Sequence, residues 1–183
     1  ASNWITDSEI QRYQQAEDKD AFELSDDLTQ LLKPSNEMRE FTNGAFDIRF
    51  KPDSIDLSGI AKGYAVDQIS KLLESKFNSE SHLVEIGGEI KARGTNPSGH
   101  PWSVGIYNPS SKKNAHTIEL SNSSIATSGN YLKGDHIIHP ITGKATGREF
   151  ISASVIHPSN AVADAMSTAL HVMGPEQGIA WAR

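Results

Sequence analysis

A segment from Asp56 to Asp67 combines a carboxylate, two glycines and a lysine with the beginning of an amphipathic pattern. Apolar residues recur after it at helical spacing, which predicts a helix with Ser58 or Gly59 as its N-cap. The free N–H groups of such a helix start, together with the Lys62 ammonium, attract an anion. The spacing matches neither a P-loop nor a G-x-G-x-x-G fingerprint. By itself the segment therefore fits a phosphate site or an ordinary helix start.

The rest of the chain alternates between helical and extended patterns. Ser25 followed by two aspartates is typical of a helix N-terminus, and Pro34 is expected to kink or divide the helix that follows. Gly87 and Gly88 separate two short strands, where they form either a bulge or a close backbone approach to a ligand. The patterns predict helices at 25–41, 62–75 and 162–172, and strands at 82–86, 89–92, 102–107, 115–120, 136–138 and 151–156.

Composition narrows the class of protein. The net charge of −6 and the lack of a basic cluster argue against non-specific nucleic-acid binding. The sequence contains no cysteine, so thiolate metal sites and disulfides are excluded, and it has no run of 18 apolar residues that could span a membrane. A chain of 183 residues is expected to form one domain.

A second polar pair lies in the predicted late helix. Asp164 and Thr168 stand four residues apart, which places both side chains on one helix face. Carboxylate and hydroxyl oxygens suit Mg²⁺, with carbonyls, water and phosphate as further ligands, and Ser167 could add one more oxygen. The other interpretation is a core helix whose Thr168 bonds its own backbone.

Together these segments resemble the ApbE-type flavin transferases, which transfer FMN from FAD to proteins. Seven motifs match in order over nearly the whole chain. They lie at residues 6–10 with Arg12, at 45–47 after 42–44, at 56–67, at 83–94, at 126–129, at 136–140 followed by 142–143, and at 164–168 ahead of 172–174. The resemblance implies a single α+β domain with mixed sheets and flanking helices.

The resemblance also implies site residues. Mg²⁺ is expected on Asp164, Thr168 and the carbonyl of Gly59, and His136 is expected to activate the acceptor hydroxyl. Asp164 and Lys62 join His136 as the expected catalytic residues. The positions expected to contact FAD are Trp4, which replaces the family's usual tyrosine, and Ala45, Phe46, Asp47, Asp56, Lys62 and Ile138.

The expected chemistry suits these residue types. Mg²⁺ and Lys62 would stabilise charge on the phosphoryl oxygens of FAD. A threonine hydroxyl needs a base to accept its proton, and a neutral histidine such as His136 can do so near pH 7. The residues alone favour the other interpretation, in which His136, in an apolar run, is a hydrogen-bonded core or strand-end residue.

Some features depart from the family pattern. Family members commonly have further segments at both ends and a long insertion between the equivalents of Asp47 and Ile48, and we expect this chain to be a shortened form without them. His139 occupies a position that is usually Asp or Asn, where it either shapes a turn or places a second imidazole beside the flavin. The first residues show no signal region or lipidation cysteine, so a periplasmic or membrane-anchored location, on the outer face of the inner membrane, is expected from the resemblance alone.

Three functions therefore remain open from the sequence. The first is Mg²⁺-dependent transfer of FMN from FAD to a threonine of an acceptor protein, such as an electron-transport subunit, with release of AMP. The second is FAD or FMN binding without transfer. The third is Mg²⁺-dependent hydrolysis of the FAD pyrophosphate, with water in place of threonine.

Overall fold

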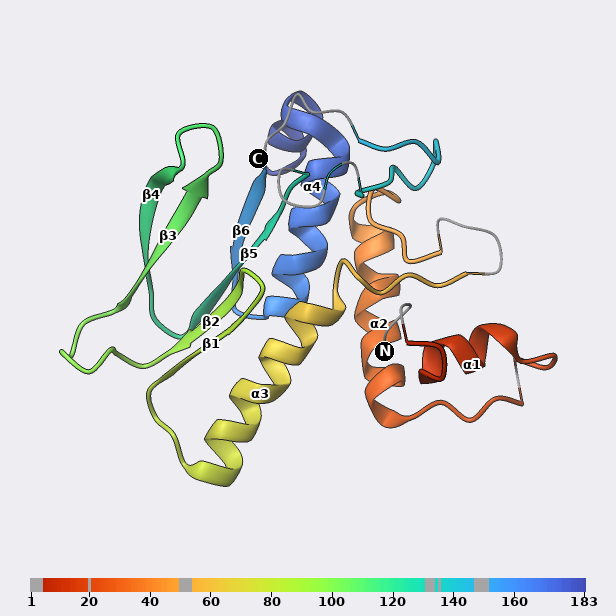
Figure 1. Cartoon of the computed structure of the whole chain (residues 1–183), viewed down its shortest axis with the longest axis horizontal. Helices are drawn as coiled ribbons and strands as arrows, with labels where there is room; N and C mark the ends of the chain where they lie inside the picture. The colour runs from red at the N-terminus through yellow and green to blue at the C-terminus, as the bar shows by residue number, and fades with distance from the viewer. Residues whose placement is uncertain (1–4, 20, 50–53, 131–133, 135, 147–151) are drawn as a thin grey trace.

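The computed structural model of the chain describes residues 5–19, 21–49, 54–130, 134, 136–146 and 152–183 (Figure 1). The helices are α1 (Glu9–Gln15), α2 (Asp26–Phe41), α3 (Ala61–Phe77) and α4 (Asn160–Trp181). The strands are β1 (His82–Ile86), β2 (Glu89–Arg93), β3 (Trp102–Asn108), β4 (Lys113–Leu120), β5 (Ser123–Ser128) and β6 (Ala153–His157).

The described strands form two antiparallel sheets. One has four strands in the order β1-β2-β5-β6, and the other is the β3-β4 hairpin. Gly87 and Gly88 have φ angles of 57° and 99°, which fit a tight type I′ turn between β1 and β2. The expected bulge is therefore wrong. The α+β class is confirmed, but every pair of neighbouring described strands is antiparallel, so the sheets are not mixed. Short turns, which join only antiparallel neighbours, connect β1 to β2 and β3 to β4.

Helix α2 confirms the predicted N-terminus. Ser25 is its N-cap, and the Ser25 hydroxyl accepts a hydrogen bond from the Leu28 N–H at 3.2 Å. Pro34 does not divide this helix, which continues to Phe41. Proline removes one backbone hydrogen bond, but the burial of Leu28 and Leu31 in the core holds the segment helical.

Helices α3 and α4 lie in the middle of the molecule (Figure 1). The two sheets lie on one side of them, and α1 and α2 lie on the other. Alanines 161, 165 and 169 of α4 are buried in the main apolar cluster, and their small side chains let neighbouring elements approach closely. A smaller cluster of Ala92, Val104, Leu120 and Ile125 joins the two sheets. None of the described helices is long and apolar enough to cross a membrane.

Three elements differ from the prediction. The expected strand at 136–138 is wrong, because Ile138 forms only an isolated bridge with Ala145. Helix α1 was not predicted, although Ser8 and Gln11 match the first and last positions of a capping box, and the Ser8 hydroxyl accepts from the Gln11 N–H at 3.3 Å. Strand β5 was also missed, because its small, mostly buried residues show no alternation.

Candidate metal and phosphate site

Asp164 and Thr168 of α4 both face the start of α3. The Gly63 N–H donates to Asp164 Oδ2 at 3.0 Å, and a Cβ atom on Gly59 would lie 3.1 Å from Thr168 Oγ1. A Cβ atom on Gly63 would collide with the carbonyl group of Asn160. Glycine at 63 is therefore required for the two helices to approach this closely. The prediction that Asp164 and Thr168 share one helix face is confirmed.

The beginning of α3 differs from the prediction. Its N-cap is Ile60, so Ser58 and Gly59 are not caps. Ser58 lies in the preceding turn, where its N–H and its hydroxyl both donate to Asp56 Oδ1, at 2.9 and 2.6 Å. Because the Asp56 carboxylate holds Ser58 in this turn, the helix begins later.

One backbone N–H group at the start of α3 already has a hydrogen-bond acceptor within the protein. The sequence predicted that the free N–H groups of this helix start point outward to an anion, but the Gly63 N–H binds the Asp164 carboxylate. The positive end of α3 therefore meets a carboxylate of the chain itself.

Two buried carboxylates and one ammonium group dominate the charge of the site. Lys62 forms an ion pair with Glu89, whose side chain is 1% exposed. Burial and the nearby charge of Asp164 raise the pKa of Glu89 to about 7. Burial also raises the pKa of Asp164, and Lys62 and the Gly63 N–H offset only part of this effect. Both carboxyl groups therefore resist ionisation, and a cation at the site would favour their charged forms.

The donors fit a hard cation. Asp164 and Thr168 supply a carboxylate and a hydroxyl oxygen. Asp164 contacts Gly63, and Thr168 lies against Gly59, whose carbonyl group is the third expected ligand. Glu89 Oε2 is buried with no hydrogen-bond partner among the described residues, so a positive charge nearby would relieve it. Within the described residues no three acidic or histidine side chains gather to hold a metal. Backbone, water and phosphate oxygens would therefore complete the coordination.

Of the other residues expected to contact FAD, some lie next to Gly59 and others lie farther from the candidate metal site. Phe46 is buried, and its ring lies 3.3 Å from the position of a Cβ on Gly59; its neighbour Ala45 is buried too. Asp47 is paired with Arg39 at 2.7 Å. That pair lines a hollow of about 400 Å³, which reaches as far as Pro140 and Ile141. Ile138, which follows a buried Ile137, is only partly buried.

His136 is exposed, and its Nδ1 lies 2.9 Å from the Gly134 carbonyl oxygen. Among the described contacts none joins it to Asp164 or Lys62, so its role as a base stays a prediction. Trp4 lies outside the described residues. His139 shapes a turn, since its Nδ1 accepts from the Ile141 N–H at 3.2 Å.

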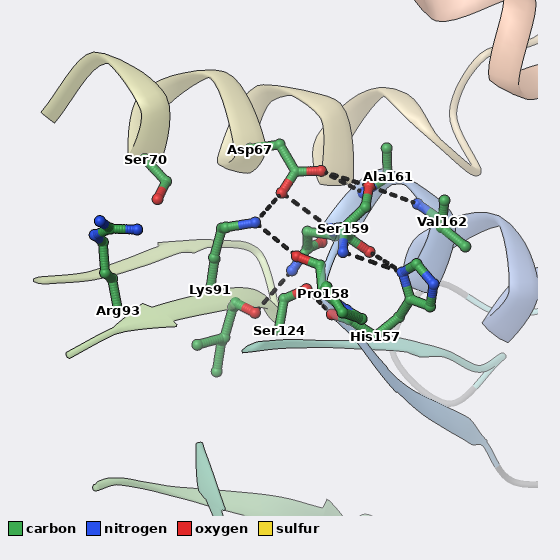
Figure 2. A network of polar contacts seen from close by, with 12 residues as sticks. Asp67, Ser70, Lys91, Arg93, Ser124, His157, Pro158, Ser159, Ala161 and Val162 are labelled. Carbon is green, nitrogen blue, oxygen red and sulfur yellow. Dashed lines mark hydrogen bonds and ion pairs between the residues drawn. The ribbon is translucent and has the colours of Figure 1, made fainter. Parts of the chain in front are cut away.

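The first turn of α4 is tied to α3 through Asp67 (Figure 2). Asp67 accepts hydrogen bonds from the N–H groups of Asn160 and Ala161 at 3.0 and 3.1 Å, and from the Ser159 hydroxyl at 2.8 Å. Lys91 pairs with the same carboxylate at 2.7 Å. Burial alone would raise the pKa of Asp67, but Lys91 and these donors outweigh it and lower the pKa. This network sets the position of α4, and therefore of its ligand face, against α3.

Sequence reasoning missed two polar residues at the site and misjudged the role of a third. Glu89 lies in the matched motif at 83–94, and Ser128 lies in the one at 126–129, but neither spacing indicated a contact with α3 or α4. Ser167 was considered as a further ligand, but its hydroxyl donates to the Asp164 backbone carbonyl at 2.9 Å. All three are buried, and only the packing of β2 and β5 on the helices brings Glu89 and Ser128 to the site.

Known proteins resemble the chain in sequence. Residues 1–54 and 50–183 match the profile of the ApbE family. A relative from Vibrio cholerae named FAD:protein FMN transferase is 40% identical over 136 residues, which are 69% of this chain and 40% of the relative. One from Escherichia coli with the same name is 38% identical over 133 residues, 67% of this chain and 38% of the relative. The chain thus spans about two fifths of the length of the curated relatives it matches.

Solved structures share the fold. The flavin transferase ApbE from Vibrio cholerae superposes with a TM-score of 0.88 at 29% identity, over 99% of this chain and 75% of that one. The apo form of the Pseudomonas stutzeri flavinyl transferase ApbE gives 0.87 at 27% identity, over 100% and 73%. The expected α+β architecture of the family is therefore confirmed.

Proposed function

The chain belongs to the ApbE family, and we propose that it transfers FMN from FAD to a threonine of an acceptor protein in a Mg²⁺-dependent reaction that releases AMP. The observation that carries this proposal is the meeting of Asp164 and Thr168 with the glycine-rich start of α3. The names of the relatives, FAD:protein FMN transferase, support it independently.

The reaction exchanges one bond to phosphorus for another. The acceptor threonine oxygen forms a bond to the FMN phosphorus, and the bond from that phosphorus to the bridging pyrophosphate oxygen breaks, so that AMP leaves with this oxygen. When bound, Mg²⁺ would neutralise charge on the phosphate oxygens. Asp164, Thr168 and the Gly59 carbonyl would hold it.

Side chains of the protein would bind the phosphate and accept the proton of the acceptor hydroxyl. The Lys62 ammonium, which lies beside Asp164 and Glu89, would bind a phosphate oxygen of FAD. His136 would accept the proton of the threonine hydroxyl. Because His136 is exposed, an acceptor side chain can approach it from solvent.

The test is incubation with FAD, Mg²⁺ and a threonine-containing acceptor, followed by intact mass of the acceptor and chromatography of the nucleotides. Transfer adds one FMN phosphoester to the acceptor and releases AMP. Free FMN with AMP identifies hydrolysis instead, and unchanged FAD bound to the protein identifies a binding protein. Either of these two results rejects the proposed transfer.

A matched pair of variants tests the metal dependence. Asp164→Asn keeps an oxygen that can accept from the Gly63 N–H, so the α3–α4 contact is retained while the negative charge is lost. We expect this variant to lose Mg²⁺-dependent FAD binding, measured by calorimetry with and without chelator. The exposed Asp26→Asn makes the same chemical change away from the site and is expected to leave binding unaltered.

A further inference from the structure

Three hydroxyl groups, of which one belongs to the expected ligand Thr168, are linked by hydrogen bonds next to the candidate metal site. Ser128 Oγ at the end of β5 lies 2.9 Å from Thr168 Oγ1 and 2.8 Å from Ser167 Oγ. Ser167 Oγ in turn donates to the backbone carbonyl of Asp164 at 2.9 Å. Ser128 and Ser167 are buried, so water does not replace these partners readily.

The number of hydroxyl protons fixes which group donates in each of these hydrogen bonds. A hydroxyl has one proton, and the Asp164 carbonyl can only accept, so the proton of Ser167 is used there. The contact between Ser128 and Ser167 then needs the proton of Ser128. The remaining contact, between Thr168 and Ser128, needs the proton of Thr168. All three hydrogen bonds can form together only in this order.

The direction matters for Thr168. Its proton points toward Ser128, so the lone pairs of Oγ1 point elsewhere, and Gly59 lies against the same oxygen. A hydroxyl that binds a cation must present a lone pair to it. A helical threonine otherwise commonly donates to the carbonyl four residues earlier, which for Thr168 is the carbonyl of Asp164. Ser167 already binds that carbonyl.

We propose that Ser128, acting through its hydrogen bond to Thr168 and supported by Ser167, is a positioning residue that turns the lone pairs of the Thr168 hydroxyl toward the cation. This inference rests on the metal site of the proposed function and extends it to a residue of β5. Outer hydrogen bonds of this kind typically change metal affinity about 10- to 100-fold when they are removed.

The test measures metal binding without flavin. Mn²⁺ takes the same oxygen ligands as Mg²⁺, and its free form can be followed by electron paramagnetic resonance. Ser128→Ala is expected to weaken Mn²⁺ affinity at least tenfold. The matched control is Thr127→Ala in the preceding position of β5, because the Thr127 hydroxyl bonds Ser154 of β6 at 2.8 Å and its removal is expected to leave the affinity unchanged.

A double variant separates positioning from a general structural effect. Thr168→Val keeps the shape but removes the hydroxyl, so adding Ser128→Ala to it should weaken Mn²⁺ binding no further. Additive losses overturn the proposal, and so does wild-type affinity in Ser128→Ala. If Ser128→Ala does not fold, Ser128→Cys keeps the volume with a weak donor, and the same two results decide the question.

The same measurements separate this inference from the proposed function. If Thr168→Val binds Mn²⁺ as tightly as the wild type, the proposed metal site itself is wrong. If Thr168→Val weakens binding but Ser128→Ala does not, the metal site stands and only the positioning role of Ser128 is rejected.

Discussion

Replacing Glu89 by glutamine should change how stability depends on pH. The Glu89 side chain is 1% exposed, and burial with the charge of Asp164 raises its pKa from the ordinary 4.5 to about 7. The folded protein therefore holds this proton more tightly than the unfolded chain does. The stabilisation from neutral Glu89 is complete below pH 4.5, declines as pH rises to about 7, and is absent above that.

The size of the effect follows from the two pKa values. Each pKa unit corresponds to about 1.4 kcal/mol, so the interval from 4.5 to about 7 amounts to about 3 kcal/mol. A glutamine side chain at this position cannot ionise. The free energy of unfolding of Glu89→Gln, minus that of the wild type, should therefore rise by about 3 kcal/mol between about pH 4 and pH 8. Loss of the ion pair adds little to this, because the Lys62 side chain is 39% exposed and can be solvated.

Urea unfolding of both proteins in chelator, across that pH range, measures this difference. The titrating groups that do not interact with Glu89 are shared by both proteins and cancel, whereas the coupling of Glu89 to Asp164 is part of the measured difference. Parallel stability profiles for the two proteins would refute the reasoning. Adding Mg²⁺ supplies a second check, because a cation on Asp164 should lower the pKa of Glu89 and reduce the difference between the profiles.

Four further changes have defined outcomes. Lys62→Met is made in a Glu89→Gln background, where the partner of the lysine carries no charge. It should weaken FAD binding by about 1.5–3 kcal/mol and leave riboflavin binding unchanged in parallel titrations. Equal FAD affinity of the variants with and without Lys62 contradicts the phosphate contact. Asp67→Asn should cost about 3 kcal/mol in urea unfolding, because it removes the buried carboxylate that binds the half-buried Lys91 ammonium and two N–H groups of α4, and a loss below about 1 kcal/mol speaks against the network. Gly63→Ala should cost about 2–3 kcal/mol because its Cβ meets the backbone of α4, and wild-type stability would show that the helices can separate freely. His136→Ala should keep FAD affinity within a few-fold but slow single-turnover transfer by about 10²–10⁴, and an unchanged rate assigns this histidine to structure.

Much of the local structure could be read from the sequence because its causes are local. Ser25 marks the start of α2 through one hydrogen bond to a residue three positions later. The spacing of Asp164 and Thr168 places both on one face of any helix. The family was also identifiable, because seven motifs in order are a property of the sequence itself.

Other features depended on contacts between distant segments. Pro34 remains helical because the core holds the residues around it, although its local preference is to break a helix. The N–H of Gly63 binds Asp164, 101 residues away, where the sequence predicted a free anion site. Glu89 and Ser128, the partners of Lys62 and Thr168, could not be predicted from the sequence for the same reason.

The sequence by itself determined the start of α2, the shared helix face of Asp164 and Thr168, and the family of this protein. Only the tertiary structure decided that Glu89 pairs with Lys62 and that Ser128 bonds Thr168, because these partners come from two different strands. The physical reason is that a side chain's charge state and proton direction depend on the groups packed around it, and those groups come together only when the sheet and the two helices close on one another.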